Sequence, residues 1–140
     1  MPGPDARLSV IWRDKWLIIA AFFLLAYARV TLSLFGFGDT RKECKRTARK
    51  PVAPPALANR IARSMTIAAR FVPASTCLVR AMAGQRLLSI KNHGSEICVG
   101  VRKKVPSGFE AHAWLVSGSA VVLGGVEEDL AQFQTLIGTP

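Results

Sequence analysis

Apolar and polar positions divide the chain of 140 residues into three blocks. Residues 8–37 are strongly apolar, although charges interrupt them and their uncharged run covers only residues 16–28. Residues 41–55 are basic and then proline-rich, which is typical of an extended connector, because proline removes a backbone donor and disfavours helix before it. From residue 57 onward, helical spacing gives way to alternation, which predicts a mixed domain of helices and strands.

Two helices are predicted at the start of the third block. Apolar residues recur at helical spacing over residues 57–70. A second helix is predicted over residues 77–90, because Ser75 or Thr76 is a natural N-cap. Cys77 then lies in the first turn. There the positive end of the helix dipole and the unpaired N–H groups favour the thiolate form of its side chain.

Alternating apolar residues predict three strands, over residues 96–102, 111–116 and 120–123. A turn rich in serine and glycine joins the second strand to the third as a hairpin. On the second strand His112 and Trp114 lie on the same face, because side chains alternate between the two faces of a sheet. Trp114 therefore either lines a cleft beside His112 or fills the core, and both interpretations stay open.

A short amphipathic helix is predicted after the third strand. Its first turn holds three acidic residues, which the helix dipole favours at that end: Glu127, Glu128 and Asp129. Its apolar residues recur at helical spacing and are expected to turn inward: Leu130, Phe133 and Ile137.

Composition and charge narrow the function classes. Half of the residues are apolar, which excludes a disordered chain. The formal net charge of +10, with every basic residue at or before Lys104, favours an anionic partner. The densest basic run, residues 41–50, contains no aromatic residue, so we expect a solvated linker and no nucleic-acid binding. Three cysteines without a CxxC pair argue against a disulfide framework and against a zinc knuckle.

Residues 8–37 allow three interpretations. The uncharged run is short for a membrane span, and extending it to residue 37 places Arg29 inside the bilayer. A signal peptide cleaved after Ala28 is the second interpretation. The third is an interfacial or core helix, which Trp12 and Trp16 suit. We expect the segment to stay on the mature protein, packed on the domain or lying at the membrane surface, in a cytoplasmic protein.

The order of the third block has a chemical meaning. A cysteine at a helix N-terminus that faces a histidine on a packed strand is what a thiol nucleophile and its base require. Spacing along the chain does not establish this pairing, because the two residues meet only in space. On the residues alone, Cys77 and His112 are either such a dyad or ordinary core residues.

The sequence around these residues is more specific. The segments CLVRAMA (77–83), VGVRK (99–103) and AHAW (111–114), in this order, resemble the lasso-peptide leader peptidases. These are stand-alone transglutaminase-like cysteine proteases of ribosomal-peptide (RiPP) biosynthesis, and the resemblance covers residues 57 to about 137. It implies an α+β, papain-like (transglutaminase-type) peptidase domain over residues 57–140. A linker over residues 41–56 and an apolar helical extension over residues 1–40 would precede it.

The resemblance also implies an activity. A peptidase of this family removes the leader from a lasso precursor and frees the amino terminus of the core. A separate, asparagine-synthetase-like cyclase then closes the macrolactam. Cys77 matches the nucleophile and His112 the general base, no cofactor or metal is implied, and a small leader-recognition protein presents the precursor.

One departure concerns the third catalytic residue. The family pattern often places an aspartate on the strand after the histidine, but residues 120–125 here contain no acid. Either Glu127 or Glu128 reaches back to the imidazole, or a backbone carbonyl or a water molecule holds it. The rival interpretation from another class is a basic adaptor at the membrane surface, in which Cys77 and His112 are structural.

Overall fold

The computed structural model describes residues 9, 12, 14–36, 50–103, 106–125 and 132–137. Within these residues, three helices come first: α2 (Lys15–Phe35), α4 (Pro55–Ala69) and α5 (Cys77–Ile90). Four strands follow in the same described part: β1 (Glu96–Lys103), β2 (Phe109–Ser117), β3 (Ala120–Leu123) and β4 (Gln134–Ile137). The strands form one antiparallel sheet in the order β3-β2-β1-β4. The α+β class, the first two predicted helices and the three predicted strands are confirmed.

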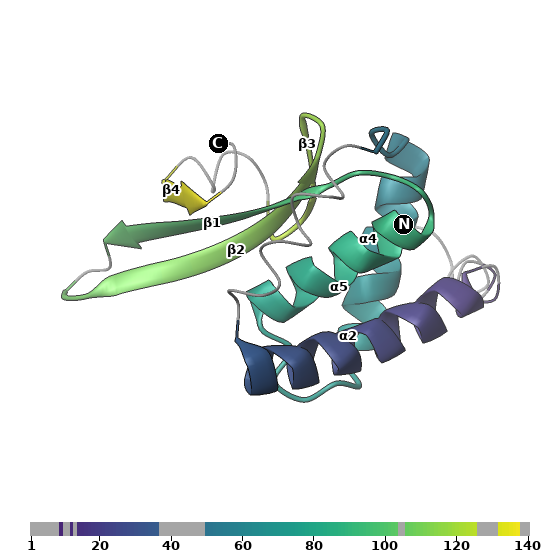
Figure 1. Cartoon of the computed structure of the whole chain (residues 1–140), viewed down its shortest axis with the longest axis horizontal. Helices are drawn as coiled ribbons and strands as arrows, with labels where there is room; N and C mark the ends of the chain where they lie inside the picture. The colour runs from purple at the N-terminus through teal and green to yellow at the C-terminus, as the bar shows by residue number, and fades with distance from the viewer. Residues whose placement is uncertain are drawn as a thin grey trace.

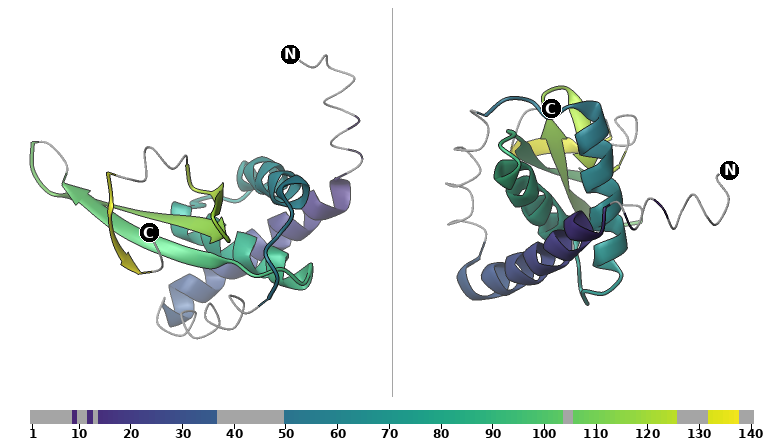
Figure 2. Two further views of the ribbon diagram at one scale, coloured as in Figure 1. Left: turned by 90° about the horizontal axis from the view of Figure 1, so that it is seen from above. Right: turned by 90° about the vertical axis from the view of Figure 1, so that its right-hand side faces the viewer.

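Helix α5 is the centre of the molecule. It lies between α2 on one side and the sheet on the other, as Figure 1 and the two views of Figure 2 show. A helix that is covered on more than one side must be apolar or small around most of its circumference. The buried residues of α5 are accordingly apolar or small, with the exception of Gln85, whose amide donates a hydrogen bond to the carbonyl of Ser95 at 3.2 Å. The others are Val79, Ala81, Met82, Ala83, Gly84, Leu87 and Leu88.

Gly84 allows α5 to approach the sheet closely. A Cβ atom at this position would lie 2.5 Å from Leu123 Cδ1 and 2.9 Å from Leu115 Cδ2. Both distances are shorter than any ordinary carbon contact, so a larger residue would require either these leucine side chains or the helix to move. The absence of a side chain at Gly84 therefore lets the middle of α5 pack closely on β2 and β3.

Helix α2 contributes one face to the main core. Its buried residues, spaced by three or four positions, pack with α4 and α5: Leu17, Ala21, Leu25 and Ala28. Just before the helix, the carboxylate of Asp14 is 2 % exposed and pairs with Arg60 of α4 at 2.8 Å. In the structure, one face of this helix packs against the core and the opposite face is exposed.

The same segment still passes a simple test for a membrane span. The helical stretch Lys15–Leu34 is long enough and apolar enough to cross a bilayer. The core helix of a soluble protein can have the same length and composition. The cytoplasmic location therefore stays a prediction. The division of the chain into an extension, a linker and a domain at residues 40 and 56 also stays a prediction.

The predicted C-terminal helix is wrong where the structure describes it. Residues 134–137 form β4, which pairs with β1 and places Thr135 opposite Gly100. The free edge of β1 offers a row of backbone donors and acceptors, and pairing with it satisfies the backbone of this short segment in place of a helix. Glu127 and Glu128, in the predicted first turn, lie outside the described residues.

A second, smaller core lies on the sheet. Cys98 of β1 and Trp114 of β2, opposite each other in the register, are both buried, and Phe133 packs against them. Cys98 is fully buried, so it serves as a small packing residue of this core. Trp114 is 4 % exposed, so the structure places it in this core.

Candidate active site

The start of α5 positions Cys77. Thr76 is the N-cap: its backbone is extended, and its hydroxyl accepts a hydrogen bond from Val79 N at 3.3 Å. Cys77 is therefore the first residue of the helix, as predicted. The N–H groups of the first turn lack partners within the helix, apart from the one that the cap satisfies. The backbone N–H of Cys77 is thus available to an oxygen anion that forms beside the thiol.

The thiol lies against the edge of β2. Ala113 N donates a hydrogen bond to Cys77 Sγ at 3.4 Å, and this links the start of α5 to the residue after His112. This hydrogen bond is possible because β3 is short. Within the described residues, β3 pairs with β2 only from Leu115 to Ser117, so the edge of β2 at Ala113 is open to the thiol.

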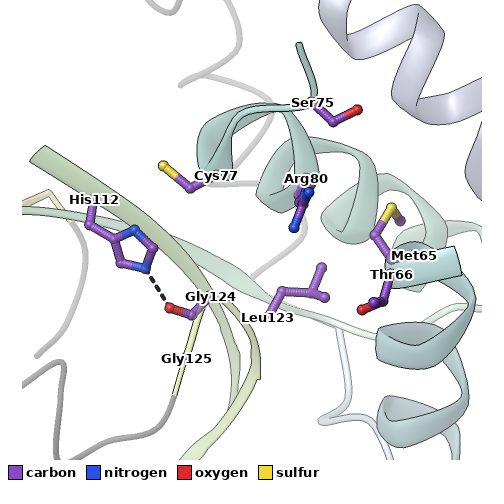
Figure 3. A pocket seen from close by; sticks show the side chains of 9 residues that line it. All are labelled: Met65, Thr66, Ser75, Cys77, Arg80, His112, Leu123, Gly124 and Gly125. Carbon is purple, nitrogen blue, oxygen red and sulfur yellow. Dashed lines mark hydrogen bonds between the residues drawn. The ribbon is translucent and has the colours of Figure 1, made fainter. Parts of the chain in front are cut away.

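The imidazole of His112 is held by a backbone group. Its Nε2 forms a short hydrogen bond with the carbonyl oxygen of Gly124, just after β3 (Figure 3). A carbonyl can only accept, so Nε2 must carry the proton of the neutral ring. Nδ1 is then unprotonated and is able to take a proton. The structure therefore provides the backbone carbonyl that was one of the open alternatives for the third role.

The position of the carbonyl that contacts His112 requires glycine at residue 124. Its φ is +104°, and a Cβ atom there would lie 2.5 Å from Trp114 Cβ and 2.7 Å from Trp114 Cα. The backbone of Gly124 is thus pressed against β2 two residues beyond His112. From the sequence, position 124 stands out only because an acid is expected in this segment. Every residue has a backbone carbonyl, so the type of residue does not indicate which carbonyl contacts the imidazole.

Cys77 and His112 line one pocket of about 440 Å³. The nine lining residues come from α4, the loop before α5, α5, β2 and the end of β3: Met65, Thr66, Ser75, Cys77, Arg80, His112, Leu123, Gly124 and Gly125. Figure 3 shows the thiol and the imidazole near each other on one side, with Met65 and Thr66 on the other. Trp114 is absent from this lining.

In the described ranges, no group of three or more His, Cys, Asp or Glu residues is arranged to hold a metal ion.

The pocket combines a nucleophile, a base with a defined tautomer and an N–H at a helix start. This set is suited to the attack of sulfur on a carbonyl carbon and to the stabilisation of the resulting oxyanion.

Comparison with known proteins points to one superfamily. The family model described as the transglutaminase-like superfamily matches residues 22–138, which include most of α2, the whole sheet and the pocket. No curated protein and no solved structure matches the chain.

Proposed function

The chain belongs to the transglutaminase-like superfamily, which includes cysteine peptidases, and on this basis we propose that it is a cysteine peptidase that removes leader peptides from lasso precursors. The observation that carries the proposal is the arrangement of Cys77, His112 and Gly124 around one pocket. A thiol and an imidazole with a free Nδ1 share that pocket, and a backbone carbonyl orients the ring. Packing alone would not require any of these features.

The first half of the reaction forms an acyl-enzyme. His112 Nδ1 takes the thiol proton, and Cys77 Sγ attacks the carbonyl carbon of the scissile peptide bond. The carbonyl oxygen becomes an oxyanion, which the backbone N–H of Cys77 stabilises. When the tetrahedral intermediate collapses, the C–N bond breaks and the imidazolium gives its proton to the leaving amine. That amine is the free amino terminus of the core peptide.

The second half regenerates the enzyme. A water molecule loses a proton to His112 Nδ1 and attacks the thioester that joins Cys77 to the leader. The C–S bond breaks, the leader leaves with a new carboxyl group, and the thiol is restored. Throughout, the hydrogen bond to Gly124 keeps the proton on Nε2, so Nδ1 is the atom that acts.

The identity of the substrate is supported by sequence. The segments 77–83, 99–103 and 111–114 resemble the lasso-peptide leader peptidases jointly, and two of them contain Cys77 and His112. The pocket of about 440 Å³ has room for only a few side chains. Recognition of a whole leader therefore needs a larger surface, which agrees with a separate leader-recognition protein that presents the precursor. An asparagine-synthetase-like cyclase would use the amine that is released.

The test is a cleavage assay with defined products. The purified chain is incubated with a lasso precursor and a leader-recognition protein that binds the leader of that precursor, and intact masses are measured. We expect two peptides whose masses sum to the precursor plus one water, with less product when the recognition protein is omitted. If the precursor stays intact although an unrelated peptide is hydrolysed, the lasso assignment is wrong. If no peptide is hydrolysed, the peptidase assignment itself is wrong.

A further inference from the structure

The outer face of α2 is apolar, although it does not face the core. Six large apolar side chains follow each other at spacings of three or four residues, so they form one continuous row on the helix surface. We call this row the outer stripe: Trp16, Ile19, Phe23, Tyr27, Val30 and Leu34, which are 45–72 % exposed. The residues buried against α4 and α5 lie on the opposite face of the helix.

Such a surface is unusual for a helix at the edge of a soluble domain. Helices of this kind normally present polar side chains to water, and a long exposed apolar patch marks a place where something binds. The outer stripe runs along the full length of α2. Its long axis is about 30 Å, since each helical residue adds about 1.5 Å. An occupant must therefore be extended and apolar along this whole length.

Cations and amphipathic rings surround the stripe. Lys15 Nζ lies 5.3 Å from the ring centroid of Trp12 and 5.7 Å from that of Trp16. The guanidinium of Arg86, on the neighbouring helix α5, lies 4.8 Å from the ring of Tyr27. Tryptophan and tyrosine beside Lys or Arg are typical of the boundary between lipid chains and headgroups. The net charge of +10 adds attraction to an anionic surface.

From these observations we propose that α2 lies flat on a membrane that contains anionic lipids, with the outer stripe among the upper acyl chains and the cations at the headgroup phosphates. Spanning fits the structure less well, because Leu25 and Ala28 would have to leave the core in which they are at most 1 % exposed. The proposal does not depend on the catalytic proposal, since it concerns a different face of the molecule.

The inferred orientation has a consequence for the candidate active site. Arg29 of α2 donates a hydrogen bond to the carbonyl of Ala74, in the loop just before Cys77. Helix α2 also packs directly against α5. A protein docked through the outer stripe would therefore hold the start of α5 at a fixed distance from the membrane.

Vesicle flotation of the full chain tests the proposal. Wild-type protein is mixed with vesicles of phosphatidylcholine alone, or with an equal part of phosphatidylglycerol, and the bound fraction is measured. We expect binding to the anionic vesicles, weaker binding at high ionic strength, and a partition coefficient about tenfold lower for Phe23→Glu. The matched control is Phe109→Glu at the start of β2, where the phenylalanine is 78 % exposed and the charge change is identical. This control should bind like wild type.

Three results would overturn the proposal. Equal losses in the two variants would mean that net charge alone drives binding, without the stripe. Absence of binding of the wild-type protein to the anionic vesicles at low ionic strength would show that the stripe does not dock on a membrane. Protein that stays with the anionic vesicles after extraction with alkaline carbonate would show that the helix spans the membrane. Binding that Phe23→Glu weakens, and that alkaline carbonate releases, supports the proposal.

Discussion

His112 donates a hydrogen bond from Nε2 to the backbone carbonyl of Gly124. In a catalytic triad the third group fixes the tautomer of the imidazole and stabilises its positive charge. A carbonyl fixes the tautomer fully, because it can only accept a hydrogen bond. It stabilises the positive charge of the imidazolium less than a carboxylate does, because it carries a dipole and no full charge. A thiol nucleophile tolerates this better than a serine would, since sulfur is the stronger nucleophile. The structure thus supports a Cys–His dyad with a backbone positioning group.

The positioning role of Gly124 can be tested by one methyl group. In Gly124→Ala the new Cβ collides with Trp114, so the carbonyl must shift. We expect single-turnover leader removal to slow at least about tenfold, or 1.4 kcal/mol of barrier, and ¹⁵N NMR to show partial loss of the Nε2–H tautomer. Gly108→Ala is the matched control, because its φ is +100° and nothing lies within 4 Å of the new methyl group. Equal effects in the two variants would contradict the role of Gly124.

The two glutamates offer a second test of the dyad. If the Gly124 carbonyl orients His112, Glu127→Gln and Glu128→Gln should each slow acylation by less than about tenfold. His112→Ala should slow it by orders of magnitude, because the base itself is lost. Single-turnover cleavage by the three variants gives the comparison. A glutamine variant as slow as His112→Ala would make that glutamate a true third member of a triad.

The cap of α5 should contribute to stability as well as to the site. Thr76→Ala removes the hydroxyl that accepts from Val79 N, and we expect the free energy of unfolding to fall by about 1 kcal/mol. The matched control is Thr31→Ala. Its hydroxyl, on α2, binds the carbonyl of Tyr27 within the helix, so the expected change is within about 0.5 kcal/mol. Urea unfolding of both variants measures the difference. A smaller loss for Thr76→Ala than for Thr31→Ala would show that the cap is unimportant.

The ion pair between Asp14 and Arg60 tests whether α2 belongs to the folded core. The carboxylate is 2 % exposed; its Oδ1 accepts a hydrogen bond from Arg60 Nε at 2.9 Å and lies 2.8 Å from Arg60 Nη2 in an ion pair. Arg60→Ala should therefore lower the free energy of unfolding by about 2 kcal/mol. Arg63→Ala, an exposed arginine of the same helix, should have little effect. If the two variants unfold alike in urea, the N-terminal segment is not docked as described.

Sequence reasoning predicted the local features that residue types encode directly. The cap at Thr76, the start of α5 at Cys77 and the face shared by His112 and Trp114 are set by neighbouring residues. The segment after β3 shows where this reasoning fails. Phe133 and Ile137 are spaced for a helix, but the open edge of β1 recruits residues 134–137 as a strand. The choice between helix and strand for this segment is decided by its pairing with β1, which is distant in sequence.

Two features of the site also escaped prediction for physical reasons. The carbonyl of Gly124 has no residue-type signature, and its position depends on how closely β3 returns to β2 beside Trp114. The contact of Ala113 with the thiol depends on the length of β3 and on the close approach of α5 at Gly84. Helix α2 could not be assigned from sequence, because an apolar pattern around the whole helix fits both a core and a membrane.

The central claim is that Cys77 is the nucleophile of a leader peptidase. Its most direct test compares Cys77→Ala with Cys98→Ala, a matched substitution at a thiol that is fully buried in the second core. Each variant is incubated with the precursor and the leader-recognition protein, and the masses of the products are followed over time. We expect Cys77→Ala to fold as wild type and release no leader, and Cys98→Ala to retain most of the activity. Release of the leader by Cys77→Ala at the wild-type rate would contradict the account.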